Sequence, residues 1–149
     1  MERIELLAPA GSMESLIAAI NRGADAIYLG GSKFSARAYA SNFDNETMEK
    51  AVDYAHTYGV KVYVTVNTLI KENEFQEAVD YIGVLYKIGV DALIIQDVGL
   101  AKRIREVYPD FELHASTQMS IHNGEGALFF RENGFFRIDK KQIFAQKIF

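Results

Sequence analysis

Four segments of the chain share one hydrophobic pattern: an amphipathic stretch ends at a glycine, and an apolar run follows directly. The glycines are Gly23, Gly59, Gly89 and Gly134. A glycine just past a helix end can adopt the left-handed conformation that satisfies the last carbonyl groups of the helix. A buried strand that begins within about two residues of it is typical of the short αβ loop in a repeating (β/α) unit. The pattern therefore predicts a parallel α/β fold.

The spacing of these glycines supports the same interpretation. Successive glycines are 36, 30 and 45 residues apart, which fits one (β/α) unit each time. Residues 23–29 and 89–95 are near copies of each other, two units apart. In parallel α/β proteins the functional residues gather at the carboxyl ends of the strands, so candidate chemistry is sought there.

Apolar periodicity predicts five strands with a helix after each. The strands are expected at residues 4–8, 26–29, 61–66, 93–95 and 111–115. The first helix should begin after Ser12 as its N-cap, and the third near Asn73, with Gln76 forming a partial capping box. The fifth helix spans about residues 123–133. Apolar residues at helical spacing mark the second and fourth helices: Met48, Ala51, Val52 and Ala55 in the second, and Leu100, Ala101, Ile104 and Val107 in the fourth.

The length of the chain decides how much of a barrel it can form. A closed (β/α)8 barrel takes about 250 residues, and this chain has 149. We therefore expect a partial TIM-like barrel of about five βα units over residues 1–136. Residues 137–149 show no clean strand pattern, so they are predicted to be an irregular tail, of the kind that a truncation or frame shift produces. A barrel cut after five strands has two open edges, and we expect the isolated chain to be inactive and to associate.

Composition excludes several classes of site and favours one location. The chain has no cysteine, which excludes disulfides, a thiolate metal site, a cysteine nucleophile and an iron–sulfur cluster held by this chain alone. No stretch is long and apolar enough to span a bilayer, and the first residues do not begin a signal peptide. A cytoplasmic location is therefore expected.

Residues 137–149 carry a net charge of +3, which leaves 12 basic and 19 acidic residues in the remainder. An acidic body argues against a large nucleic-acid footprint, although a local basic groove is compatible with it.

Polar and small residues gather where the predicted strands end. In a parallel barrel these strand ends meet at one open end of the barrel, which we call the mouth. The residues expected to contact a substrate there are Arg37, Asn67, Gln96, Asp97, Ser116 and Gln118. A ligand in this mouth would meet amides, hydroxyls, one guanidinium and one carboxylate.

Some of these residues have a structural alternative. Asp97 is equally suited to cap the fourth helix, and Arg37 to be a solvated surface residue. His114 is expected to be a strand residue whose ring nitrogen is satisfied. No catalytic residue can be named, and no spacing of histidine and acidic residues predicts a metal site.

Several ordered motifs resemble one known family. The matching segments are residues 5–12, 23–31, 34–37, 63–68, 95–97 and 114–120. Together they resemble the amino-terminal region of the collagenase-like peptidase family of unassigned catalytic type, whose members include proteins of RNA and ubiquinone-precursor hydroxylation. The resemblance covers about residues 3–135.

This resemblance implies a TIM-like barrel and a peptide or RNA substrate. It implies either a peptidase or a protein of tRNA or rRNA hydroxylation. Relatives of the second kind use an iron–sulfur cluster, whose cysteines lie downstream of the matched region.

The functional class stays open at this point. The chain is either the amino-terminal part of a family enzyme, or a non-catalytic domain that completes a barrel with another chain. That other chain would be a second copy or a separately encoded carboxyl-terminal half. An unrelated small-molecule enzyme on a parallel sheet is the third interpretation.

Overall fold

The computed structural model describes residues 4–36 and 43–138. Within these residues, six strands form one sheet, and each strand pairs in parallel with the next one along the chain. The strands are β1 (Leu7–Pro9), β2 (Ala26–Gly30), β3 (Lys61–Val66), β4 (Ala92–Ile95), β5 (Glu112–Ala115) and β6 (Arg137–Ile138). The helices are α1 (Met13–Asn21), α2 (Asn45–Thr57), α3 (Phe75–Ile88), α4 (Val98–Val107) and α5 (Gly124–Glu132), with 3-10 turns η1 (Glu72–Glu74) and η2 (Thr117–Met119).

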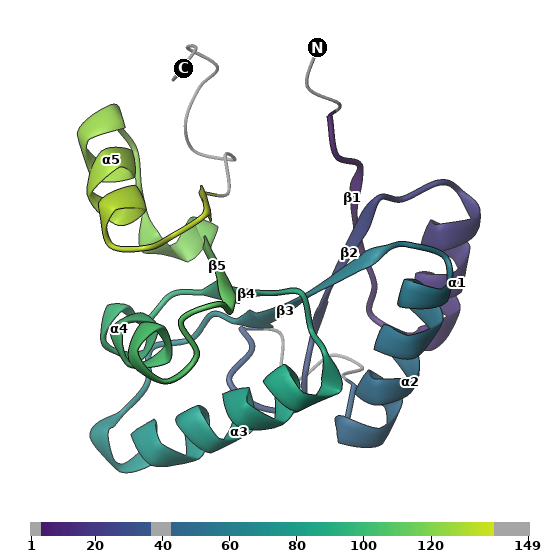
Figure 1. The fold of residues 1–149 in the computed structure, drawn as a ribbon, viewed down its shortest axis with the longest axis horizontal. Helices are drawn as coiled ribbons and strands as arrows, with labels where there is room; N and C mark the ends of the chain where they lie inside the picture. Colours follow the sequence, from purple (N-terminus) through teal and green to yellow (C-terminus); the bar gives the residue numbers. More distant parts are fainter. Residues whose placement is uncertain (1–3, 37–42, 139–149) are drawn as a thin grey trace.

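The sheet curls, and the helices form an arc around its outside (Figure 1). The arc runs from α1 and α2 through α3 to α4 and α5, while the strands line the inside. The result is a curled half-barrel of alternating strands and helices, which confirms the predicted parallel (β/α) fold.

The four glycines that define the repeat adopt the predicted conformation. Their φ angles are +87° at Gly23, +70° at Gly59, +91° at Gly89 and +88° at Gly134. At Gly89, the backbone N–H groups of the glycine and of the following residue bond to carbonyl groups in the last turn of α3. The glycine thus ends the helix and turns the chain into the next strand.

Polar side chains begin most of the helices, and the sequence predicted the first of them, Ser12. The Ser12 side chain accepts a hydrogen bond from the N–H of Ser15, and Asp44 and Asn123 cap α2 and α5 in the same way. The predicted capping box at the start of the third helix is wrong. There, Glu74 accepts from the N–H of Lys71 at 3.2 Å, and the Gln76 amide instead donates to Asp80.

The sixth strand is the main departure from the predicted secondary structure. Arg137 and Ile138 pair with His114 and Ala115 of β5, whereas the sequence pattern had suggested no strand after residue 136. The strand was missed because it is two residues long and begins with a charged side chain, so it has no apolar run to reveal it. Residues 139–149 lie outside the described part of the chain.

The two faces of the sheet have different chemistry. The outer face packs against the helices with fully buried apolar side chains, such as Ile27, Val64 and Leu93. Because side chains alternate along a strand, the residues between them face the inside of the curl. That inner face holds small residues, such as Ala26 and Ala92, and also the polar residues described below.

Candidate functional site

Three of the predicted residues lie side by side at the carboxyl ends of the central strands. The last paired residues of β3, β4 and β5 are register partners of one another. The residues that follow them are Asn67, Gln96 and Ser116, which therefore form one row. By the alternation of the strands, this row belongs to the inner face. The structure thus brings these three predicted residues together at one end of the sheet.

Asn67 holds the loop that follows β2. Its Oδ1 accepts a hydrogen bond from the N–H of Ala36 at 3.0 Å. Beside it, the hydroxyls of Ser35 and Thr65 are 3.0 Å apart, and the Thr68 hydroxyl donates to the carbonyl of Phe34. The end of β3 therefore fixes the backbone up to Ala36. The next residue, Arg37, lies outside the described residues.

The same loop contains a strained residue and a close contact. Phe34 has a φ of +57°, a region that non-glycine residues seldom occupy. Gly31 lies against Tyr81 so closely that a Cβ there would stand 1.7 Å from the tyrosine hydroxyl. Burial raises the pKa of Tyr81 to about 12, so this hydroxyl stays protonated. Strain of this kind persists only where surrounding contacts enforce it, and it clusters at functional sites.

Asp97 serves as a structural brace. Its Oδ1 accepts from the N–H of Leu100 at 2.8 Å and so caps α4. Its Oδ2 accepts from the N–H of Ile70 at 3.1 Å, in the loop after β3. Of the two interpretations of this residue, the helix cap is the one with direct contacts.

The last two predicted residues belong to the turn after β5. Ser116 is buried, and its hydroxyl accepts from the N–H of Gln118 at 3.3 Å. Gln118 lies in η2 and is exposed. Ser120, which ends this turn, has a φ of +55°. The loops after β2 and β5 thus both contain a non-glycine residue in the left-handed region.

A group of polar residues inside the curl was not singled out from the sequence. We call it the lumen cluster, and it comprises Glu5, Tyr63, Glu112, His114 and Arg137. The Tyr63 hydroxyl donates to Glu5 Oε2 at 2.9 Å, and Arg137 Nη1 donates to Glu5 Oε1. The other carboxylate, Glu112 Oε1, lies 2.6 Å from His114 Nε2. Glu5, just before β1, is thus bonded to residues of β3 and β6, whereas the Glu112–His114 contact lies within β5.

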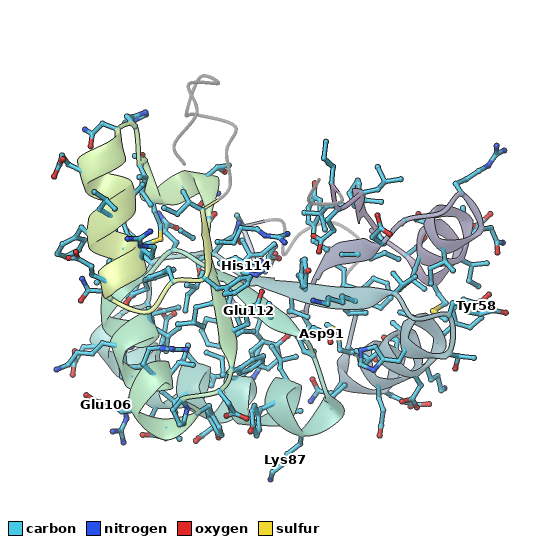
Figure 2. The ribbon with its side chains drawn as sticks, turned by 45° about the horizontal axis from the view of Figure 1, so that its top comes forward. Tyr58, Lys87, Asp91, Glu106, Glu112 and His114 are labelled. Atoms are coloured by element: carbon cyan, nitrogen blue, oxygen red, sulfur yellow. The ribbon has the colours of Figure 1, made fainter. Side chains whose placement is uncertain are left out.

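Ring contacts hold the cluster together as well. The Tyr63 and His114 rings meet edge to face, with their centroids 4.7 Å apart. The Arg137 guanidinium lies 5.6 Å from the centroid of the Tyr63 ring, within the range of a cation–π contact. Figure 2 shows His114 and Glu112 next to each other near the centre of the molecule.

Burial within the lumen cluster is graded. The residues Tyr63 and His114 are 1% and 3% exposed, whereas the side chains of Glu5, Glu112 and Arg137 are 24%, 27% and 34% exposed. The hydrogen bond from Arg137 holds the pKa of Glu5 below its usual value. Burial lowers the pKa of His114 and raises that of Tyr63. At neutral pH the cluster therefore contains an ionised Glu5, a neutral imidazole and a protonated phenol.

The lumen cluster lies directly beneath the mouth. His114 is two residues before Ser116 along the chain, and its register partners are Ile94 and Arg137.

The sequence contained a signal for the lumen cluster, since Glu112, His114 and Ser116 occupy alternate positions and must share a face of the sheet. Their partners on β1, β3 and β6 could not be inferred without the register. The expectation that the His114 ring nitrogen is satisfied is confirmed by its contact with Glu112.

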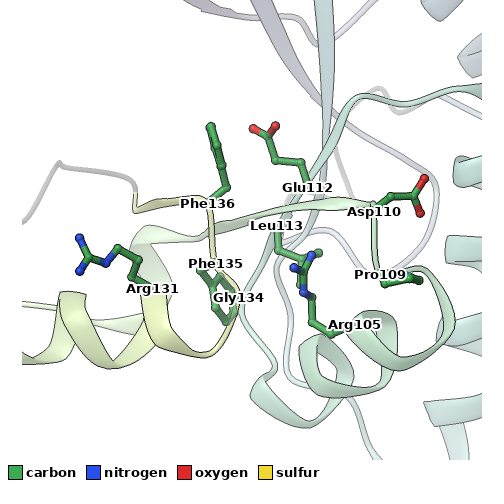
Figure 3. A pocket seen from close by; sticks show the side chains of 9 residues that line it. All are labelled: Arg105, Pro109, Asp110, Glu112, Leu113, Arg131, Gly134, Phe135 and Phe136. Carbon is green, nitrogen blue, oxygen red and sulfur yellow. The ribbon is translucent and has the colours of Figure 1, made fainter.

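A surface pocket of about 310 Å³ lies at the opposite ends of the strands. It is lined by residues from the end of α4, the start of β5 and the turn after α5, including Arg105, Asp110 and Phe136. In Figure 3, Glu112 and Phe136 point to one side of β5, and Arg105 points to the other. At the amino ends of barrel strands, side chains usually serve stability. We therefore place the candidate site at the mouth and the lumen.

The described residues do not provide a metal or cluster site. Among residues 4–36 and 43–138, no three histidine or acidic side chains are grouped so that they could hold a metal ion. The whole sequence contains no cysteine, so this chain offers no thiolate to an iron–sulfur cluster. In the same part of the chain, no helix has the length and apolar character needed to cross a membrane.

Comparison with known proteins gives a family and several relatives. The family model described as Peptidase family U32 matches residues 11–139. The 23S rRNA 5-hydroxycytidine C2501 synthase of Escherichia coli is 45% identical over 136 residues, covering 91% of this chain and 20% of that protein. The tRNA hydroxylation protein P1 of Bacillus subtilis is 37% identical, covering 90% and 32%. A collagenase of Porphyromonas gingivalis is 38% identical, covering 85% and 30%. The chain thus spans a third or less of each of these relatives.

Solved structures agree on the fold. The structure of a U32 peptidase superposes with a TM-score of 0.73 at 16% identity, covering 91% of this chain and 57% of that one. An aldolase gives a TM-score of 0.69 at 17% identity, covering 93% and 68%. At these identities, the likeness establishes a TIM-barrel-like architecture and nothing about activity.

Proposed function

This chain is a member of peptidase family U32, and we propose that it forms the amino-terminal barrel portion of an RNA-hydroxylation protein rather than of a protease. The observation that carries the proposal is the 45% identity to the E. coli 23S rRNA 5-hydroxycytidine synthase across 91% of the chain. The P. gingivalis collagenase reaches 38% over a shorter segment. The tRNA hydroxylation proteins named among the relatives support the same class.

The mouth residues are better suited to recognise a base than to cleave a peptide. Asn67 and Gln96 present amides, which can pair with the donor and acceptor edges of a nucleobase. Ser116 bonds to the backbone of Gln118 rather than to a histidine, so it lacks the partner that activates a serine nucleophile. Enzymes that modify a base place it in a pocket after turning it out of the stack. A mouth lined by amides and a hydroxyl offers such a base neutral hydrogen-bonding partners.

We assign the remaining predicted residues supporting roles in this site. Arg37 would pair with an RNA phosphate, because a guanidinium binds phosphate oxygens in a fork-like geometry. Gln118 would contact the substrate from η2. Asp97 would act by holding the loop after β3 through its bond to Ile70. Hydroxylation needs a redox group, and ligands for an iron–sulfur cluster would have to come from outside this cysteine-free chain. A cytoplasmic location follows from an RNA substrate.

A second candidate is a non-catalytic domain that completes a barrel with another chain. The observation in its favour is that β1 and β6 end the sheet, so among the described residues each of them pairs with a strand on one side only. Apolar side chains near these edges are exposed, with Ile4 at 91%, Leu6 at 54% and Phe136 at 72%. Open edges and exposed apolar residues favour association. The partner would be a second copy or a separate carboxyl-terminal half.

A chimera tests the first proposal. The segment of the E. coli synthase that matches this chain is replaced by residues 1–136 of this chain, and the chimera is expressed in a strain that lacks the synthase. Mass spectrometry of its 23S rRNA should detect 5-hydroxycytidine at position C2501. The control carries the matching segment of the P. gingivalis collagenase and should give none. A chimera that is folded and abundant but leaves the rRNA unmodified would contradict the proposal.

Light scattering of the isolated chain tests the second candidate. If the isolated chain is a stable homo-oligomer, the second candidate gains support.

A further inference from the structure

Helix α3 lies against the loop that follows β2, at the mouth. The rings of Tyr81 and Phe34 pack with their centroids 6.0 Å apart. Lys33 forms an ion pair with Glu77 of the same helix. Gly31 lies directly against the Tyr81 hydroxyl. We call these five residues the α3 latch, because through them a helix of the outer layer contacts a loop of the mouth.

The contact at Gly31 leaves no room for a side chain. A Cβ on Gly31 would stand 1.7 Å from the Tyr81 hydroxyl oxygen and 3.0 Å from Cζ of the same ring. The next atom, Cε of Met48, is at 3.7 Å, an ordinary van der Waals distance. The φ of Gly31 is not positive, so backbone strain does not require a glycine there. The requirement comes mainly from one atom, the Tyr81 hydroxyl oxygen.

The helix is the fixed partner in this contact. On α3, Ile82 and Leu85 are fully buried in the core, and Tyr81 is 7% exposed. In the loop, Lys33 and Ala36 are exposed. Close-packed interiors resist displacement. A change in the distance between α3 and the loop is therefore taken up by the loop.

The position of the loop reaches the mouth through Asn67. The N–H of Ala36 donates to Asn67 Oδ1 at 3.0 Å, and the Thr68 hydroxyl donates to the carbonyl of Phe34 at 3.2 Å. Phe34, which packs on Tyr81, has a φ of +57°, a conformation that surrounding contacts must enforce. A loop displaced from α3 would lose its bond to Asn67, whose amide is one of the proposed substrate contacts.

We propose that Tyr81 is a positioning residue for the mouth. Its hydroxyl sets the distance between α3 and the loop after β2, and this distance places the Asn67 amide for the substrate. Tyr81 acts through the loop, because its own side chain packs in the core between the sheet and the helices. The effect on an RNA substrate rests on the proposed function, whereas the placement of the loop by Tyr81 does not.

Paired substitutions at positions 31 and 81 test the latch in the full chain. Gly31→Ala directs a methyl group at the hydroxyl, and Tyr81→Phe removes that oxygen but keeps the ring. Amide hydrogen exchange, measured by mass spectrometry, reports local opening of the loop. In Gly31→Ala, peptides that cover residues 31–36 should exchange roughly tenfold faster or more, while those of α3 are unchanged. The double variant should regain part of the protection, since Cζ still lies 3.0 Å from the new Cβ.

Two matched controls separate this contact from general effects of the substitutions. Gly124→Ala adds the same methyl group where no atom lies within 4 Å of it, so the loop should exchange as in the unsubstituted chain. Tyr86→Phe removes the same oxygen from the same helix, where the hydroxyl donates to Asp110. Combined with Gly31→Ala, it should restore no protection to the loop.

Two results of the exchange experiment would overturn the proposal. One is unchanged exchange of the loop in Gly31→Ala. The other is a double variant that is no better protected than Gly31→Ala, which would show that the hydroxyl is not the atom that matters. If Gly31→Ala does not fold, Tyr81→Leu takes its place, because it removes the ring and the hydroxyl without adding a clash. Unchanged exchange of the loop in Tyr81→Leu would overturn the proposal equally.

The rRNA chimera connects the latch to the substrate. At equal abundance, Gly31→Ala should lower the level of 5-hydroxycytidine about tenfold or more, because small misplacements in a site are costly. Adding Tyr81→Phe should restore part of the product, and adding Tyr86→Phe should not. A displaced loop with full activity would overturn the positioning role. If the unsubstituted chimera makes no product while the exchange results hold, the proposed function fails and the placement of the loop by Tyr81 stands.

Discussion

The two ends of the sheet are built in different ways. At the amino ends, a repeated device connects neighbouring strands: Asp25 accepts a hydrogen bond from the N–H of Leu6 at 2.8 Å, and Asp91 accepts one from Val62 at 2.7 Å. Both aspartates come two residues after a glycine of the repeat. At the carboxyl ends, the loops differ from one another, and residues such as Phe34 and Ser120 adopt strained conformations.

This difference indicates that the amino ends of the strands contribute to stability, whereas the carboxyl ends contribute to ligand binding. A device that recurs in two units of the repeat serves what those units share, which is the closing of the turn onto the sheet. Within the described residues, the loops at the other end share no such device, and these loops contain Asn67, Gln96 and Ser116. Substitutions at the amino ends should therefore lower stability, whereas substitutions at the carboxyl ends should impair ligand binding with little loss of stability.

The largest effect is expected from Asp91→Ala. The substitution leaves the N–H of Val62 without its partner and removes the contact between Asp91 and His56. Loss of a hydrogen bond to a charged group lowers the free energy of unfolding by about 2 kcal/mol. Urea denaturation measures the loss, with Asp53→Ala, at an exposed position of α2, as the control. If both variants are equally stable, the structural role of the amino ends is refuted.

A smaller effect is expected from Gly89→Ala. The space around this glycine is open, so the new Cβ meets no atom, but the φ of +91° strains any other residue. The expected loss in the free energy of unfolding is about 1 kcal/mol. Gly124→Ala is the matched control, because its surroundings are also open and its φ is not in the left-handed region. Equal melting temperatures for the two variants would show that the turn tolerates a side chain.

Asn67→Ala tests the other end of the sheet. It removes one hydrogen bond to the exposed Ala36, so the free energy of unfolding should fall by only about 0.5 kcal/mol. The loop that precedes Arg37 loses its anchor, and in the chimera the level of 5-hydroxycytidine should fall at least tenfold. Asn67→Asp keeps the acceptor and should retain more activity. A variant that unfolds, or one that keeps full activity, contradicts the assignment of Asn67 to the site.

The fold could be predicted because its determinants are local. Each glycine turn and the Ser12 N-cap depend on residues a few positions apart in the sequence, and the structure confirms them. The third helix was placed correctly, but its capping box was assigned to the wrong residues, because Glu74 and Gln76 are equally suited to that role by type alone.

The candidate site was only partly predictable. Asn67, Gln96 and Ser116 follow apolar strands, and that position alone indicates the mouth. The lumen cluster depends on the register between strands and on one contact between residues 132 positions apart, Glu5 and Arg137. Neither quantity is encoded in a local pattern. The strand that carries Arg137 was also missed, so its partner Glu5 had no visible role.

The smallest effect concerns pH and sharpens the contrast between the lumen and the amino ends. The lowered pKa of His114 means that the unfolded chain binds more protons below about pH 6.5. The free energy of unfolding should therefore fall as the pH drops from 7 to 5. Glu5, whose pKa is also lowered, continues the decline below about pH 4.5 as its carboxylate becomes protonated. His114→Gln should flatten the first part of the profile and Glu5→Gln the second. A profile that neither variant changes would show that the lumen cluster does not contribute to it.

The strand order also has a consequence for biosynthesis. Since every strand pairs with the one made just before it, each new unit can dock as soon as it leaves the ribosome, without waiting for distant sequence. The contact of Glu5 with Arg137 is different, because one partner is made at the start and the other after the fifth helix. Glu5 can receive the hydrogen bond from Tyr63 earlier, but it must wait for its guanidinium partner until synthesis has passed residue 137. The lumen is thus the last part of the described fold to be assembled, and a nascent chain acquires its candidate chemistry only after its scaffold is in place.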